Sequence, residues 1–264
     1  MRVLKWIGIG LLVVVAAVAG FLVVSTAVDA LMGGDRVATL TNTSIDSGDG
    51  PTLRAFVAAP AEDGPHPAVI MLHEFYGLRP DVTEKAAALA EEGYVVVAPD
   101  MYRGQTTGWI PRAIYLALSI PEVQVLADLD PVYAWLAAQP NVDPERIVVM
   151  GFCYGGGKAL QYSLRNPALA GTGVFYGALV DDPAVLATLP GPVLGIFGRE
   201  DQAPSPAMVE GFAAGLDAAG VPATIRIFDG VGHAFVGDMA TIAAGGAPGE
   251  AWALFLQWLS ETVG

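Results

Sequence analysis

The chain has 264 residues, of which 53% are hydrophobic and 15% are charged, so it is long and apolar enough to fold and is not a disordered chain. Its 13 basic and 27 acidic residues give a net charge of −14, which makes nucleic acid an unexpected partner. The single cysteine excludes an intramolecular disulfide framework and a cysteine-based metal site.

The first predicted element is apolar and N-terminal. Residues 6–28 carry no charge and follow Arg2 and Lys5. As a helix these residues would measure roughly 34 Å, enough to cross a bilayer core of about 30 Å. We therefore predict one transmembrane helix in an N-terminal unit of residues 1–34, with a hinge at residues 32–35 and a membrane as its partner. A cleaved signal peptide is the first alternative, because small residues follow the apolar run, and a buried core helix is the second.

The position of the basic residues predicts the orientation of this helix. Cations on the short leading end favour retention of that end in the cytoplasm. Residues 35–264 would then form one domain outside the cytoplasm, or a secreted domain if the N-terminal segment is cleaved.

Short apolar runs and helical segments alternate through residues 35–264. The predicted strands are 37–45, 53–58, 68–72, 94–98, 147–151, 173–176, 193–197 and 223–228. The predicted helices are 81–92, 121–138, 155–165, 205–219 and 249–263. Continuous apolar strands separated by helices indicate a mostly parallel sheet covered on both faces, which is a three-layer α/β domain. A turn at residues 47–50 predicts that the first two strands pair as a hairpin.

The strongest chemical signal is the sequence Gly151-Phe152-Cys153-Tyr154-Gly155. It follows a predicted strand and opens a predicted helix, as in a nucleophile elbow with sulfur in place of oxygen. Glycines are needed because the turn is sharp and leaves no space for a Cβ. The helix N-terminus would favour a thiolate, so we predict Cys153 as the nucleophile. A small buried hydrophobic residue is the alternative for an isolated cysteine.

A nucleophile of this kind needs a base and an acid that orients it. Of the three histidines, only His233 follows Cys153 in the chain, and it lies in a loop after a predicted strand. Asp201 ends an earlier strand and is the predicted acid, with Glu200 as the lesser candidate. The alternatives are a helix-capping role for Asp201 and a solvated loop for His233.

An oxyanion hole needs two backbone N–H groups directed at one point. We predict the N–H of Tyr154, which follows the nucleophile, and that of Phe75, which lies in the loop after residues 68–72. The segment 108–120 contains Trp109 and other apolar side chains between prolines. It is predicted to lie beside an apolar pocket, with ordinary packing of a surface helix as the alternative.

These motifs resemble the dienelactone hydrolases, cysteine members of the α/β-hydrolase superfamily. The resemblance covers the chain from about residue 49 to the end. It rests on the sequences His73-Glu74-Phe75-Tyr76-Gly77, Ala98-Pro99-Asp100-Met101-Tyr102, Gly151-Phe152-Cys153-Tyr154-Gly155-Gly156, Gly198-Arg199-Glu200-Asp201 and Gly232-His233-Ala234-Phe235. It implies a Cys153, Asp201 and His233 triad, with Glu74 contacting the resting thiol and helping to deprotonate it when substrate arrives.

The resemblance also implies where substrate binds. The family holds a substrate carboxylate with arginines, and Arg103, beside Tyr102, is the candidate for one of them. A second arginine follows the histidine loop in the family, but here Phe235 and its neighbours bring no cation. Dienelactone itself is therefore not the expected substrate.

The predicted function is hydrolysis of carboxylic ester or lactone bonds through a thioester acyl-enzyme, with no metal and no organic cofactor. A carboxylesterase or thioesterase for apolar acyl substrates is the alternative within enzymology. A non-catalytic, membrane-anchored binding module on the same scaffold is the alternative from another class. The expected partner is a small ester or lactone, and the sequence predicts no oligomeric state.

Overall fold

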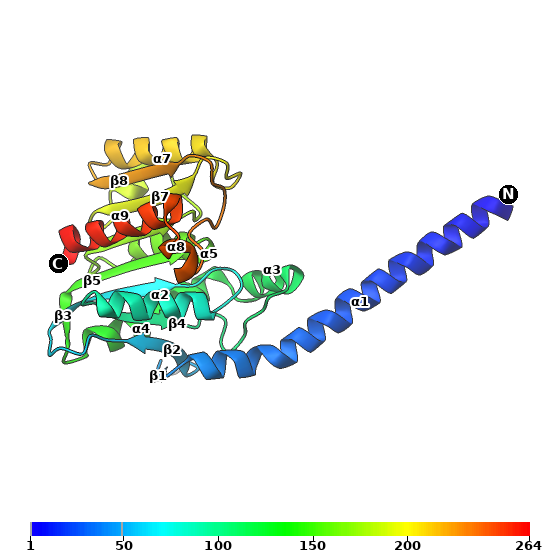
Figure 1. Cartoon of the computed structure of the whole chain (residues 1–264), viewed down its shortest axis with the longest axis horizontal. Helices are drawn as coiled ribbons and strands as arrows, with labels where there is room; N and C mark the ends of the chain where they lie inside the picture. Colours follow the sequence, from blue (N-terminus) through cyan, green and yellow to red (C-terminus); the bar gives the residue numbers. More distant parts are fainter. Residues whose placement is uncertain (1, 49) are drawn as a thin grey trace.

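The computed structural model describes residues 2–48 and 50–264, with the side chains of all of these except residues 2–9, 11 and 32–35. Asp49, part of the predicted turn at residues 47–50, therefore lies outside the described residues. So do the side chains of Arg2, Lys5 and the predicted hinge. The described chain forms one long N-terminal helix that runs away from an α/β body (Figure 1).

The body is built on one sheet in the order β1-β2-β4-β3-β5-β6-β7-β8. Its strands are β1 (Thr43–Ile45), β2 (Leu53–Ala58), β3 (His66–Leu72), β4 (Val95–Pro99), β5 (Val142–Phe152), β6 (Gly171–Phe175), β7 (Val193–Gly198) and β8 (Ala223–Phe228). β2 pairs antiparallel with both β1 and β4, and all other neighbours are parallel. The predicted mostly parallel α/β architecture is confirmed.

The central strands are buried on both faces, which explains their unbroken apolar sequences. In β3, Val69 and Met71 pack into one core with the helices α2 (Pro80–Glu91) and α9 (Gly246–Val263), whereas Ile70 and Leu72 pack into a second core with α4 (Glu122–Ala137) and α5 (Tyr154–Ser163). This alternation is the period of two expected for a strand between two layers of helices. The carboxyl ends of the parallel strands consequently share one edge of the sheet.

The helices connect the strands as the sequence predicted, with several additions. They are α1 (Arg2–Leu40), α2 (Pro80–Glu91), α3 (Ile110–Ser119), α4 (Glu122–Ala137), α5 (Tyr154–Ser163), α6 (Pro183–Leu186), α7 (Pro206–Ala218), α8 (Met239–Ala243) and α9 (Gly246–Val263). The segment predicted beside a pocket is α3, a surface helix. The short helices α6 and α8 were not predicted, because 4 and 5 residues are too few to show helical periodicity. Each is capped by the side chain of an aspartate.

The N-terminal region differs most from the prediction. The backbone of α1 stays helical through residues 32–35, where a hinge was predicted, and through Val37–Leu40, where a strand was predicted. The strand begins only at Thr43. The segment Leu12–Leu40 has a mean hydropathy of 2.3 in its most apolar window, none of which is buried, so α1 is long and apolar enough to cross a membrane.

Candidate active site

Cys153 lies at the turn between β5 and α5, at the carboxyl edge of the sheet. Its backbone has φ 53° and ψ −114°, a left-handed conformation that is strained for a residue with a side chain. A Cβ on Gly151 would lie 2.4 Å from the backbone of Gly155, and one on Gly155 would lie 2.4 Å from the Leu72 carbonyl oxygen. The two motif glycines are therefore required for the turn that presents the thiol.

Three side chains from separate loops meet at this turn. The Nε2 of His233, after β8, lies 3.0 Å from the Cys153 sulfur. Its Nδ1 lies 2.7 Å from Oδ2 of Asp201, which follows β7. Asp201 is 4% exposed, and its Oδ1 accepts the Ala203 N–H at 2.9 Å. An ionised Asp201 thus places the Nδ1 proton toward itself and directs Nε2 at the sulfur, whereas Glu200 is exposed.

The charge state of His233 follows from these contacts. The hydrogen bond to the Cys153 sulfur is the largest influence, and it raises the pKa of His233 to about 9. Burial opposes this rise, and the hydrogen bond to Asp201 supports it. At neutral pH the imidazole therefore holds a proton on each ring nitrogen, and Nε2 faces the sulfur as a hydrogen-bond donor.

The two backbone N–H groups predicted for the oxyanion hole come from the start of α5 and from the loop after β3. Tyr154 is the first residue of α5, so its N–H has no partner within the helix. Phe75 lies in the loop after β3. These are the two groups that the sequence predicted for an oxyanion hole.

The loop that carries Phe75 is held by His73, whose role the sequence did not predict. Its Nδ1 lies 2.7 Å from the Glu74 carbonyl oxygen, and its Nε2 accepts the Met101 N–H at 3.1 Å. His73 is fully buried, and this burial lowers its pKa to about 4. The neutral ring therefore joins the loop after β3 to the loop after β4.

Glu74 is half-buried beside the same loop. Burial raises the pKa of its carboxyl above the usual range, and the nearby Asp81 adds to the rise. The positive charges of Lys85 and His233 act in the opposite direction. Among the described residues, no hydrogen bond is seen between this carboxyl and the thiol of Cys153, so the role that the family resemblance implies for Glu74 stays a prediction.

A cavity of about 380 Å³ opens in front of Cys153 and His233. Its other lining residues are Glu122, Tyr154, Gly157, Lys158, Gln161, Tyr176, Ala178, Leu179, Ala203, Pro204 and Met208. The wall is thus largely apolar, with one acidic and one basic side chain. The thiol consequently faces a space that can hold a small ester.

The acidic and basic side chains of this cavity form an ion pair. Lys158 on α5 donates to the carboxylate of Glu122, the first residue of α4, and to Oε1 of Gln161 at 3.0 Å. Its Nζ also lies 5.1 Å from the centre of the Tyr154 ring. The sequence analysis missed both charged residues, and the position of Lys158 on the helix that begins after Cys153 was the available signal.

The structure does not bring Arg103 to the cavity. Its guanidinium forms a two-pronged ion pair with Asp128 on α4: Nε donates to Oδ2 at 3.0 Å and Nη2 donates to Oδ1 at 3.0 Å. Arg103 lines a different cavity, near Asp100 and Arg54. The expected substrate-binding cation of the sequence analysis therefore serves a structural ion pair here.

The other three predicted substrate-binding side chains also lie outside the cavity lining. Tyr102 is buried with its ring 5.6 Å from that of Tyr154, behind the nucleophile helix. Phe235 packs 5.9 Å from Tyr176. Trp109, at the start of α3, packs against α1 instead. All three contribute to the packing around the site and its neighbouring loops.

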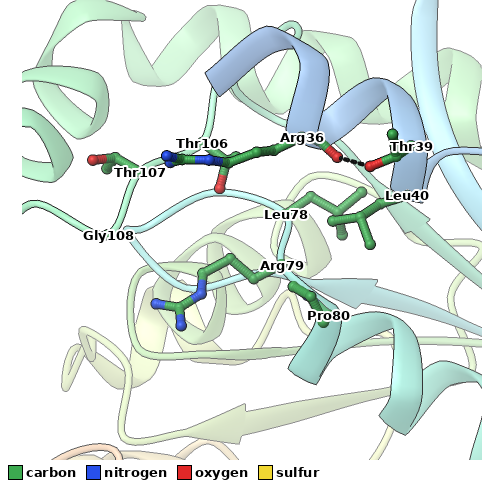
Figure 2. Close-up of a pocket in the computed structure, with 9 residues that line it drawn as sticks. All are labelled: Arg36, Thr39, Leu40, Leu78, Arg79, Pro80, Thr106, Thr107 and Gly108. Atoms are coloured by element: carbon green, nitrogen blue, oxygen red, sulfur yellow. Dashed lines mark hydrogen bonds between the residues drawn. The ribbon is translucent and has the colours of Figure 1, made fainter. Parts of the chain in front are cut away.

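A second cavity, of about 320 Å³, lies under the end of α1 (Figure 2). It is lined by Arg36 and Leu40 of α1 and by Leu78, Arg79 and Thr106 of the body. None of the three residues joined at Cys153 lines it. Within the described ranges, no group of three or more His, Cys, Asp or Glu side chains is placed to hold a metal ion.

The comparisons with known proteins agree on one family. The model of the dienelactone hydrolase family matches residues 53–263. A protein of Escherichia coli K12 named "putative carboxymethylenebutenolidase" is 33% identical over an alignment of 254 residues that covers 90% of each chain. A similarly named protein of Salmonella typhimurium is 34% identical over 234 residues and covers 83% of this chain and 86% of its own.

Solved structures show the same likeness. The crystal structure of a "putative dienelactone hydrolase" from Klebsiella pneumoniae has a TM-score of 0.72 and 31% identity, and covers 83% of this chain and 96% of its own. A dienelactone hydrolase-like promiscuous phosphotriesterase from metagenomic libraries has a TM-score of 0.73 at 20% identity, covering 84% and 98%. The second likeness concerns the fold alone.

Proposed function

The chain belongs to the dienelactone hydrolase family of carboxylic ester hydrolases, and from this premise we propose that it cleaves esters or lactones by acyl transfer to Cys153. In this proposal His233 and Asp201 complete the triad. One observation carries it: the sulfur, the imidazole and the carboxylate form a continuous chain with separations of 3.0 and 2.7 Å. A positioned nucleophile, base and orienting acid are the requirements of covalent acyl transfer.

The first step forms a thioester. The Cys153 thiolate attacks the carbonyl carbon, and an electron pair moves onto the carbonyl oxygen. The N–H groups of Tyr154 and Phe75 hold this oxyanion, each contributing about 3 kcal/mol in a comparable site. When the intermediate collapses, the alkoxide leaves and takes the Nε2 proton of His233.

The second step releases the acid. Formation of the thioester removes the hydrogen bond between the Cys153 sulfur and His233, the largest influence that raises the pKa of His233. The imidazole is then neutral near neutral pH and accepts a proton from water, which attacks the thioester carbonyl. The thiolate leaves, and the imidazolium faces it again. Glu74, which carries a raised pKa near the site, is the alternative to His233 as the group that takes the Cys153 proton before the attack.

The preferred acyl group is uncharged. Besides His233, which contacts the Cys153 sulfur and Asp201, the basic side chain of the cavity is Lys158, which is paired with Glu122, so a substrate carboxylate would have to displace an existing partner. Apolar residues such as Leu179 and Met208 supply much of the remaining wall. These observations favour simple esters, thioesters and neutral lactones over an anionic dienelactone.

Membrane anchorage is part of this proposal. The length and hydropathy of α1 support a bilayer span, and Arg2 and Lys5 at its start favour a cytoplasmic N-terminus. The hydrolase domain would then lie outside the cytoplasm. The mass of the mature protein tests this point, because a chain that begins near residue 30 would identify a cleaved signal instead.

A panel of p-nitrophenyl esters and small lactones tests the enzymatic proposal. We expect the wild type to hydrolyse the neutral members and Cys153→Ala to lose this activity. His66→Ala, which changes a histidine far from the cavity, serves as the matched control for His233→Ala. Equal rates in wild type and Cys153→Ala would refute the mechanism and favour the binding-module alternative.

A further inference from the structure

Exposed apolar side chains are concentrated in two helices. The large hydrophobic residues with high exposure are, on α1, Leu12, Val13, Val14, Val15, Val18, Phe21, Leu22, Val23, Val24, Val28 and Leu31, and, on α3, Ile110, Ile114, Tyr115 and Leu118. In the described part of the chain only Val123, Val185 and Met208 add to this set. Monomeric soluble domains rarely gather such residues, so this surface is expected to have a partner.

The helix α3 is apolar on two opposite faces. Ala113 and Leu116 face the body and are 0% and 4% exposed. Ile110, Ile114 and Leu118 are spaced by four residues, which places them on one outer face, and they are 55%, 50% and 79% exposed. The inner face explains the attachment of α3 to the body, whereas the outer face contributes nothing to that packing.

Direct contacts place α3 beside α1. The rings of Phe21 and Trp109 meet edge to face with centres 6.2 Å apart. Oδ2 of Asp29 lies 3.6 Å from Nε of Arg112 on α3. In Figure 1, α3 projects from the α/β body toward α1. The outer face of α3 is therefore continuous with the apolar surface of the helix that is long enough to span a bilayer.

We infer that the outer face of α3 enters the surface of the same lipid bilayer that α1 crosses. This inference rests on the membrane anchorage proposed above. A helix lying in the interface buries its apolar face about 5–10 Å deep and keeps charged groups at the headgroup level. The Asp29 and Arg112 pair provides charged groups where α1 meets α3, and Trp109 is an aromatic residue of the kind enriched at membrane interfaces.

This arrangement determines which esters reach the active site. The chain passes from α3 through Ile120 and Pro121 to Glu122, which borders the cavity of Cys153. An α3 held at the lipid surface therefore brings the cavity close to that surface. The favoured substrates are esters that partition into the bilayer, rather than esters freely dissolved in water.

Depth-dependent quenching tests the contact without relying on catalysis. The full-length chain carries Cys153→Ala, so that Leu118→Cys provides one cysteine for an environment-sensitive fluorophore. Glu210→Cys on α7 is the control, since α7 lies far from α1 (Figure 1). The proteins are placed in phosphatidylcholine vesicles that contain lipids with a nitroxide on the acyl chain, and vesicle flotation verifies insertion of α1.

We expect the acyl-chain nitroxide to quench the fluorophore at position 118 and leave the one at position 210 unaffected. Quenching of the fluorophore at position 118 by aqueous iodide alone would overturn the inference. Burial of that fluorophore against a second copy of the chain, detected as energy transfer between labelled chains, would also overturn it. Because Cys153 is absent, these results do not depend on the proposed acyl-transfer mechanism.

Activity provides a second readout in the chain that retains Cys153. The double variant Ile114→Ser/Leu118→Ser should hydrolyse a water-soluble ester like the wild type. Its rate on an ester dissolved in vesicles should fall at least about fivefold, because less apolar surface enters the lipid. Unchanged rates on both esters would contradict the inference. A wild type inactive on both would refute the proposed function instead, leaving the quenching result to decide the membrane contact.

Discussion

The carboxyl edge of the sheet and the α1 and α3 pair present opposite kinds of surface. At the edge, polar groups converge: Asp201 is nearly buried, and both ring nitrogens of His233 have partners. On α1 and α3, apolar side chains point outward and few polar contacts hold the helices together. The carboxyl edge of the sheet therefore holds its charged groups partly shielded from solvent, whereas α1 and α3 expose apolar surface.

This difference indicates that catalysis and membrane contact are separable. The groups proposed for acyl transfer are held by the ends of β5, β7 and β8, none of which contacts lipid in the proposed arrangement. Changes at the triad should consequently leave vesicle binding intact, and changes on α1 or α3 should leave the chemistry on soluble esters intact. Each prediction below tests this separation or one of its two sides.

The largest effect is expected for Asp201→Asn. The amide cannot hold His233 in the tautomer that directs Nε2 at the sulfur, so kcat/KM on a soluble ester should fall about 10³- to 10⁴-fold. Vesicle flotation should not change. Glu200→Gln, an exposed neighbour, is the matched control and should keep wild-type activity. A loss below about tenfold would remove Asp201 from its proposed role.

The second prediction concerns His73 and the loop that carries Phe75. Burial lowers the pKa of His73 from 6.5 to about 4 in the folded chain. Between these two pH values, only the unfolded chain therefore binds a proton at His73. The contribution of His73 to stability is constant above pH 6.5 and should fall by about 3 kcal/mol as the pH decreases to 4, whereas the raised pKa of Asp100 acts in the opposite direction.

Urea unfolding of the full chain in detergent at pH 7, 5.5 and 4.5 measures this loss. His73→Gln removes the titrating group, so the variant should lack this component of the pH dependence even if it is less stable at pH 7. His66→Gln is the control and should keep the wild-type slope. Identical slopes in wild type and His73→Gln would contradict a buried neutral imidazole.

Much of the sheet and the proposed triad could be predicted from local sequence. Strands buried on both faces give continuous apolar runs, and the Cys153 turn needs glycines at fixed positions. His233 and Asp201 were found because strand ends in a parallel sheet share one edge, and because one histidine follows Cys153 in the chain. These features depend on short spacings and on topology.

The remaining features depend on partners distant in sequence. Arg103 was expected to meet substrate, but its partner is Asp128, and Lys158 is neutralised by Glu122 from another helix. Trp109 packs against α1, which the sequence analysis separated from the body by a hinge. No local pattern reports such pairings. The helix likewise continues past residues 32–35, although two glycines there are unfavourable in a helix.

A moderate effect on specificity is expected for Glu122→Gln. The hydrogen bond to Lys158 lowers the pKa of the Glu122 carboxyl, so this side chain is ionised at neutral pH and neutralises the lysine. Without the charge of Glu122, the ratio of the rate on an anionic acyl ester to the rate on a neutral one should rise about fivefold. The partial exposure of the Glu122 and Lys158 pair limits the size of this effect. Assays of p-nitrophenyl hemisuccinate and butyrate measure the ratio.

A matched double variant checks the cause of this change. Adding Lys158→Met to Glu122→Gln should return the ratio to the wild-type value, because the released cation is removed. A ratio that stays raised in the double variant would show that Lys158 is not the group that selects against anions. Neither substitution should alter vesicle flotation.

The smallest effect is expected for Asp29→Asn, where the two regions come closest. The substitution removes the ion pairs to Arg112 and Arg36, but the Phe21 and Trp109 contact and the buried inner face of α3 remain. The partly exposed Arg36 pair contributes about 1 kcal/mol or less. The Arg112 pair is nearly buried but is not hydrogen-bonded at 3.6 Å, and Arg112 keeps its hydrogen bond to Gln105, so the vesicle-to-soluble rate ratio should fall no more than about fivefold. A decreased rate on the soluble ester would instead mean that α1 supports the catalytic edge through α3 and α4, and the two regions would then not be separable.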